Sequence, residues 1–142
     1  MLPTGDILAT VRMLQEENLD VRTVTMGINI SDCAGRDPAA VADAVHRKIH
    51  LRAGRLVRVC DELTHRYGIA IVNKRLAVSP ASFLLEGHRG DAAVRLGEAL
   101  DRAAREVGVD LIGGMTALVQ KGMTPGERLL IESLPAVLSS TQ

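Results

Sequence analysis

The stretch Val21-Arg22-Thr23-Val24-Thr25-Met26-Gly27-Ile28-Asn29-Ile30 decides the fold class of this chain. Its apolar side chains alternate with small or polar ones, which is the period of a β-strand that has one apolar and one polar face. Residues 31–38 predict a loop that ends in a helix cap, because Asp37 can accept backbone N–H groups and Pro38 suits the first helical position. A strand, a loop and a capped helix in this order predict a βα unit.

Two more strand and helix alternations follow this first unit. Apolar residues spaced three or four apart predict one continuous helix that ends at Tyr67-Gly68, and Gly54 is the point at which it could kink. A short apolar run without alternation comes next, as expected for a parallel strand covered on both faces, and Ala77 and Val78 could extend it. The expected elements are a helix over 7–18, strands over 21–30, 69–72 and 109–112, and helices over 41–67, 93–107 and 124–138.

The order of these elements predicts an α/β fold. Alternating βα units indicate a mainly parallel sheet with right-handed crossovers, and ligands of such sheets bind at the carboxyl ends of the strands. We expect residues 1–142 to form a single α/β domain. Because three strands leave sheet edges unpaired and apolar faces uncovered, we also expect association, either as a homo-oligomer or with a complementary chain.

The composition limits the class of protein. Hydrophobic residues make up 46% of the 142, which is enough for a folded core. Seventeen basic and seventeen acidic side chains cancel, and neither sign gathers into a long run, so we expect neither nucleic acid nor a membrane as partner. Two cysteines without metal-ligand spacing indicate reduced thiols, and the first residues lack the pattern of a signal peptide, so we expect a cytoplasmic protein.

Asp32 and Cys33 are the candidate catalytic residues, because they lie just past the predicted end of the first strand. A thiol at this place could act as a nucleophile and a carboxylate as a base. The alternative is a small buried thiol in a turn in which Asp32 caps backbone donors, since cysteine is often buried as a plain hydrophobe. No histidine is close in sequence to activate the thiol.

Asn73, Lys74 and Arg75 are the candidate substrate-binding residues, because they follow the predicted second strand. An amide beside two cations could hold a carboxylate or phosphate, or one of the cations could instead pair with an acid or face water. Gly113 and Gly114, after the third strand, could let backbone N–H groups approach an anion. The alternative for the two glycines is a tight strand-to-helix turn, since no nucleotide-binding glycine pattern is present.

Other polar residues carry weaker signals. Thr23, Thr25 and Asn29 form the polar face of the first strand, which would line the interior of a barrel or lie exposed on a plain sheet. His46 and His50 have the i, i+4 spacing of a metal-binding pair, but no acidic residue accompanies them as in a zinc-binding helix. We therefore predict no metal site, and the residues do not identify a cofactor.

Three segments at or after the predicted strands resemble one protein family. They are Arg22–Ile28 running to Asp32-Cys33, Ile71–Arg75 running to Ser79-Pro80, and Glu106–Gly114 continuing through Ala117–Gly122. Over nearly its whole length the chain resembles the N-terminal part of uncharacterised protein family 0210, also called domain of unknown function 711. The resemblance implies a fold like the first part of the ten-stranded α/β barrel of pyruvate formate-lyase, and it implies no established reaction.

The sequence departs from this family in two ways. Met115 stands where an aromatic residue is expected, and family members continue into more strands beyond the position of Leu138. The glycyl-radical chemistry of pyruvate formate-lyase needs a radical glycine in a distant C-terminal segment, so this chemistry is not carried over.

Two hypotheses about function follow. In the first, the chain is part of a barrel enzyme that binds a small anionic metabolite, with Asn73, Lys74 and Arg75 on the anion and Asp32 and Cys33 near the chemistry. In the second, it is a non-catalytic interaction or binding module that needs a partner chain to complete its barrel.

Overall fold

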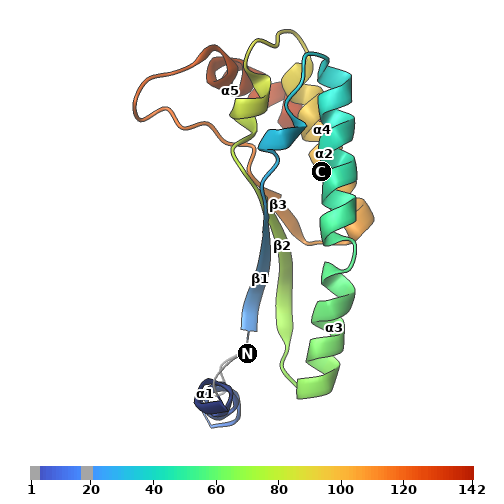
Figure 1. Cartoon of the computed structure of the whole chain (residues 1–142), viewed down its shortest axis with the longest axis vertical. Helices are drawn as coiled ribbons and strands as arrows, with labels where there is room; N and C mark the ends of the chain where they lie inside the picture. The colour runs from blue at the N-terminus through green and yellow to red at the C-terminus, as the bar shows by residue number, and fades with distance from the viewer. Residues whose placement is uncertain (1–3, 17–20) are drawn as a thin grey trace.

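The protein is an α/β structure with one three-stranded parallel sheet, as the sequence predicts (Figure 1). This computed structural model describes residues 4–16 and 21–142. In chain order its elements are α1 (Thr4–Gln15), β1 (Val21–Ile28), the 3-10 turn η1 (Ser31–Cys33), α2 (Pro38–Ala53), α3 (Leu56–Tyr67), β2 (Ile71–Val78), the 3-10 turn η2 (Ala81–Leu85), α4 (Ala92–Val107), β3 (Leu111–Gly113) and α5 (Pro125–Ser140). Residues 17–20, at the end of the expected first helix, lie outside the described part.

The strands lie in the order β1-β2-β3, so β2 is central. β1 runs beside β2 along its whole length, from Val21 opposite Ile71 to Ile28 opposite Val78. β3 is short and pairs only with Arg75 to Ala77. Within the described residues, the outer edges of β1 and β3 have no strand beside them.

The second strand is longer than the sequence analysis predicts. The expected strand ends at Val72, with an extension by Ala77 and Val78 left open, but β2 runs from Ile71 to Val78 and contains the polar triplet 73–75. The expected end was wrong because it assumed that helices cover both faces of the sheet. Asn73 and Arg75 lie on the face that no described helix covers, and Lys74, on the helix side, pairs with Asp61.

The core lies between the sheet and helices on one of its sides. From the strands, Ile28, Leu76 and Val78 are buried, and they pack in one cluster with residues of α2 and α4. The helical contributors include Val45, Ile49, Leu96 and Leu100. Figure 1 shows α2 and α3 following one another along that side, while no helix among the described residues runs along the opposite side of β1 and β2.

The cap predicted for the second helix is present. The carboxylate of Asp37 accepts hydrogen bonds from the backbone N–H groups of Ala39, at 3.1 Å, and Ala40, at 3.3 Å, and Pro38 is the first helical residue. The helix expected to continue to Tyr67 is instead interrupted at Gly54, so that α2 and α3 are separate helices.

The last helix is present where the sequence predicts it, since α5 spans Pro125–Ser140 and a helix over 124–138 is expected. A capping box at Thr124 and Glu127 fixes its start. Gly113-Gly114 does not form a tight turn into a helix, because residues 115–124 lie between the glycines and α5. In the described part of the chain, no helix is both long and apolar enough to cross a lipid bilayer.

Candidate functional site: the helix-free face of the sheet

One face of the sheet carries mainly polar and small side chains from its middle to its carboxyl end, and none of the described helices lies over it. Side chains alternate along a strand and partners in the register share a face, so this face is the one opposite the buried Ile28, Leu76 and Val78. We call it the helix-free face. Its members are Val21, Thr23, Thr25, Gly27, Ile71, Asn73, Arg75, Ala77, Leu111 and Gly113.

Arg75 lies at the centre of the helix-free face. Its neighbours in the register are Thr25 on β1 and Leu111 on β3. The side chain is half-buried, and its buried Nε–H has no hydrogen-bond acceptor among residues 4–16 and 21–142. Among the described residues, the guanidinium has no carboxylate within ion-pair distance. A half-buried cation with an unmatched donor can gain a charge-assisted hydrogen bond from an anionic ligand.

Asn73 lies two residues before Arg75 on the same face. Its Nδ2 donates a hydrogen bond to the backbone carbonyl of Arg22, at 3.1 Å, which fixes the orientation of the amide because a carbonyl can only accept. The Oδ1 atom is therefore left as an acceptor. The hydroxyl of Thr23, the register partner of Asn73, adds a group that can donate or accept.

Small residues follow Arg75 toward the carboxyl ends of the strands. Gly27, Ala77 and Gly113 lie opposite one another on the three strands, so this level of the sheet has almost no side-chain bulk above it. Beyond it, Ser79 Oγ accepts the Ile30 N–H at 3.0 Å and donates to Asn29 Oδ1 at 3.3 Å. The helix-free face thus offers a cation, an acceptor and open space, with a polar end.

Lys74 is separated from its two neighbours by the alternation of the strand. Its ammonium lies on the helix side, 3.2 Å from a carboxylate oxygen of Asp61 on α3. Its backbone N–H donates to the carboxylate of Asp110, at 2.7 Å. The structure therefore brings Asn73 and Arg75 together and places Lys74 elsewhere.

Asp32 and Cys33 lie in η1, beyond the end of β1. Arg75 lies opposite Thr25 on β1, and Ile30, the residue before η1, is five residues further along the chain. Five residues of extended strand span roughly 16 Å. The predicted composite site, with both groups around one ligand, is therefore not assembled within the described residues. A catalytic role for Asp32 and Cys33 and a ligand role for Asn73 and Arg75 remain separate predictions.

The electrostatics at η1 disfavour an activated thiol. Lys48 on α2 hydrogen-bonds the carboxylate of Asp32 and holds its pKa below the ordinary value, so Asp32 is ionised and is a poor base. Burial, and next the charge of Asp32, raise the pKa of the Cys33 thiol. The Sγ atom lies 4.0 Å from Asp32 Oδ1. Sequence reasoning missed Lys48, whose only signal is its position one residue before the buried Ile49 on the capped helix.

The paired glycines serve packing more than ligand approach. Gly114 has φ of +125°, and a Cβ atom there would lie 2.6 Å from the backbone oxygen of Val78. Its own carbonyl accepts the N–H of Ala81 at 2.9 Å. Gly114 thus lets the chain after β3 approach the end of β2, while Gly113 remains on the helix-free face.

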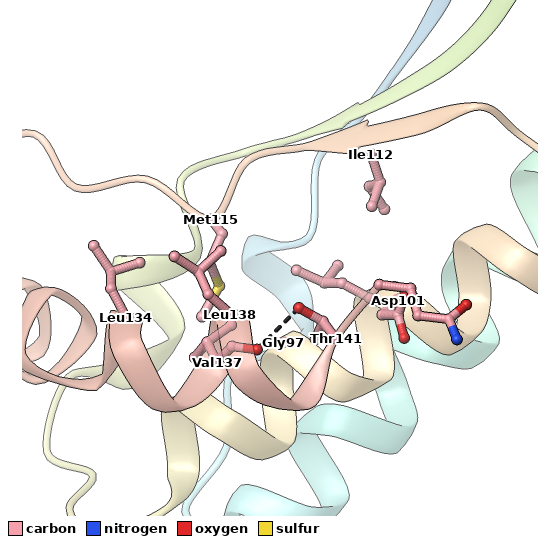
Figure 2. Close-up of a pocket in the computed structure, with 10 residues that line it drawn as sticks. Gly97, Asp101, Ile112, Met115, Leu134, Val137, Leu138 and Thr141 are labelled. Carbon is pink, nitrogen blue, oxygen red and sulfur yellow. Dashed lines mark hydrogen bonds between the residues drawn. The ribbon is translucent and has the colours of Figure 1, made fainter.

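An apolar pocket lies on the helix side, between β3, α4 and α5 (Figure 2). Ile112 and Met115 line it from the sheet, and Leu134 and Val137 line it from α5. At its rim, Thr141 Oγ1 donates to the backbone carbonyl of Val137 at 2.9 Å. The carboxylate of Asp101 is engaged by Arg105 at 2.5 Å. The pocket is separate from the helix-free face and offers no free charged group to a ligand.

The two histidines of α2 with i, i+4 spacing, for which no metal site is predicted, have different surroundings. His46 Nε2 lies 2.8 Å from Glu106 Oε2, which joins α2 to α4, while His50 is exposed. No cluster of three metal-ligating side chains occurs in the described parts of the chain. Cys60 is buried in α3, as its place in the apolar stripe predicts.

A parallel sheet whose helices gather on one side places the chain among α/β proteins built from successive βα units. The chain belongs to the family described as Uncharacterised ACR (DUF711), whose model matches residues 12–142. It is 51% identical to a UPF0210 protein of Desulforudis audaxviator, 48% to one of Syntrophobacter fumaroxidans and 46% to one of Desulforamulus reducens. Each match covers all 142 residues of this chain and 31% of the relative, so the chain spans about a third of these proteins.

Proposed function

We propose that this chain forms part of a cytoplasmic α/β barrel protein and that its helix-free face lines an interior which binds a small anionic metabolite. The observation that carries the proposal is Arg75, a half-buried cation with an unmatched Nε–H at the centre of a face without helices. Closing a sheet into a barrel turns its uncovered face inward, where polar side chains can meet a ligand.

The surroundings of Arg75 support binding of an anion. Thr23, Thr25 and Asn73 give the face hydrogen-bonding groups, and Gly27 and Ala77 leave space beside them. The relatives are about three times as long as this chain, so they have enough further residues to complete a barrel. Binding is better supported than catalysis here, because the pKa of Cys33 is raised and that of Asp32 is lowered.

A titration followed by NMR tests the proposal. Small carboxylates and inorganic phosphate are added to the 15N-labelled chain at constant ionic strength, and the Nε–H signal of Arg75 is followed. We expect saturable shifts that Arg75→Gln abolishes. Arg22→Gln is the matched control, because Arg22 is an exposed arginine of the same sheet on the opposite face. Equal weakening by both variants would mean that only general electrostatic attraction is present.

The second candidate function is a non-catalytic module that associates with a partner chain or with another copy. It is favoured by apolar side chains left exposed, such as Leu111 at 54%, Val72 at 58% and Leu138 at 72%, and by the open edges of β1 and β3. Light scattering over a range of concentrations tests self-association. A stable dimer or larger assembly supports this candidate, and a monomer at all concentrations contradicts self-association.

A further inference from the structure

We infer that the group bound at Arg75 is a monocarboxylate that carries a hydrogen-bond donor, a hydroxyl or an ammonium group, next to its carboxylate. The inference rests on the proposed function, because it names the chemical class of the anion. It goes beyond that function in assigning the carboxylate to Arg75 and the donor to Asn73.

The charge on the helix-free face favours one negative charge on the ligand. Arg75 is the one cationic side chain that the register places on this face within the described strands, since Lys74 lies on the other side and pairs with Asp61. Phosphate sites in α/β proteins commonly use helix N-termini or glycine-rich turns. Here α2 and α5 begin beyond the carboxyl ends of the strands, several residues above the level of Arg75. A planar carboxylate matches the single guanidinium fork.

The amide of Asn73 is the group that would contact the hydrogen-bond donor next to the ligand's carboxylate. One hydrogen of its Nδ2 is donated to the carbonyl of Arg22, the second hydrogen stays available, and Oδ1 is the acceptor that this amide offers to a ligand. A group that meets this atom must donate a hydrogen bond. Asn73 and Arg75 are two residues apart on one strand, roughly 7 Å along it, a span that the long arginine side chain can shorten. One small molecule can therefore reach both.

The experiment compares four probes on the 142-residue chain by NMR at constant ionic strength. Propionate has the carboxylate alone, lactate adds a hydroxyl, alanine adds an ammonium group, and inorganic phosphate is the alternative anion. The signals of Arg75 Nε–H and Asn73 Nδ2–H report binding. We expect lactate to bind about fivefold tighter than propionate, which is the size of one neutral hydrogen bond, and alanine, whose ammonium group makes a charge-assisted bond, to bind tighter than propionate as well.

Two substitutions separate the two contacts. Arg75→Gln is expected to weaken every carboxylate by about tenfold or more. Asn73→Leu is expected to remove the preference for lactate or alanine and to leave propionate unchanged. Asn73→Ala makes the same test if the leucine variant does not fold. Arg22→Gln is again the matched control and should change none of these affinities.

The outcomes distinguish this inference from the proposed function. Equal, Arg75-dependent binding of propionate, lactate and alanine would overturn the assignment of Asn73 and keep an anion site. Tighter, Arg75-dependent binding of phosphate than of any carboxylate would overturn the carboxylate class and keep an anion site. The absence of any shift sensitive to Arg75→Gln would overturn both.

Discussion

The sheet has two halves that differ in how they are covered. In the carboxyl-end half, Ile28, Leu76 and Val78 are at most 8% exposed and pack against α2 and α4. In the amino-end half, Val72 points to the same side but is 58% exposed, and α3 is the helix beside it. Figure 1 shows the same contrast, with several helices around the upper ends of the strands, α3 beside their lower part and α1 below the start of β1.

The helices themselves explain the difference. α4 buries nine residues, most of them small or aliphatic, and it packs between α2 and α5. α3 buries only Cys60, while Val59, Leu63 and Tyr67 remain at least 37% exposed. Burial of apolar area is the main source of stability, so the carboxyl-end half holds the fold together. The amino-end half and the helix-free face are the surfaces left for partners or ligands.

The largest expected effect is a cavity in the carboxyl-end half. Leu76→Ala removes a side chain that is 1% exposed and should lower the free energy of unfolding by about 3 kcal/mol. Leu63→Ala makes the same chemical change in α3, where the side chain is 43% exposed, and should cost below about 1 kcal/mol. Urea unfolding followed by circular dichroism measures both. Equal losses would show that the two halves are equally important to stability.

A smaller effect is expected where the chain after β3 meets β2. Gly114→Ala combines positive φ with a Cβ atom 2.6 Å from the Val78 oxygen, and should destabilise the protein by about 2 kcal/mol. Gly122 has nearly the same φ, +123°, but its surroundings are open. Gly122→Ala should therefore cost about 1 kcal/mol, from the backbone conformation alone. If the two variants unfold at the same urea concentration, the close approach of the strands contributes nothing.

The capping interactions of Glu127 at the start of α5 should depend on pH. Glu127 is buried, and its pKa is held below the ordinary value of 4.5 by hydrogen bonds from the backbone N–H groups of Thr124 and then Leu118. Because the folded pKa is the lower one, this stabilisation is present above the unfolded pKa and is lost as pH falls through the folded pKa. Glu127→Gln should destabilise the protein at neutral pH, by less than Gly114→Ala, since glutamine keeps one of the two acceptors.

The same variant should approach the parent protein in stability as the solution is acidified. Urea unfolding at several pH values between about 7 and 3 measures the difference, which should shrink below the ordinary pKa of the carboxyl group. Glu132→Gln, on an exposed position of the same helix, is the control. A constant difference between parent and Glu127→Gln over the whole range would contradict the role of the charge.

Local patterns predicted most of the elements of the fold. The alternation of 21–30, the cap at Asp37 and Pro38, and the apolar stripe of 93–107 each depend on neighbouring residues, and the structure has β1, α2 and α4 at these places. The end of β2 could not be predicted in this way. Whether Asn73 to Arg75 continue a strand depends on which face of the sheet lacks helices, and that is a property of the whole chain.

The candidate site shows the same limit. The sequence proposed Asn73 and Arg75 as part of an anion site, because an amide and a cation follow an apolar run, and the structure places both on one face of the sheet. It could not separate Lys74 from them, since the acidic partner of Lys74 is Asp61 on a helix before the strand. It also grouped Asp32 and Cys33 with the anion site, because it placed the end of β2 six residues too early.

The smallest expected effect is a change in the pKa of the Cys33 thiol, which lies in η1 beyond the end of β1. Burial is the first cause of the raised pKa of Cys33, and the charge of Asp32 is the second, while Lys48 acts in the opposite direction. Asp32→Asn removes the negative charge and frees Lys48, so the pKa of Cys33 should fall. It should stay above the ordinary thiol value, because the burial is unchanged.

The rate of alkylation of Cys33 as a function of pH measures this shift, and mass spectrometry separates it from reaction at the buried Cys60. Asp43→Asn, which removes another exposed carboxylate on α2, should leave the profile unchanged. In the parent protein the thiol should react slowly at neutral pH, because it is protonated there. Rapid alkylation at neutral pH would instead mean that Cys33 is already a thiolate, and the catalytic role predicted from its position after β1 would then be favoured over the buried thiol.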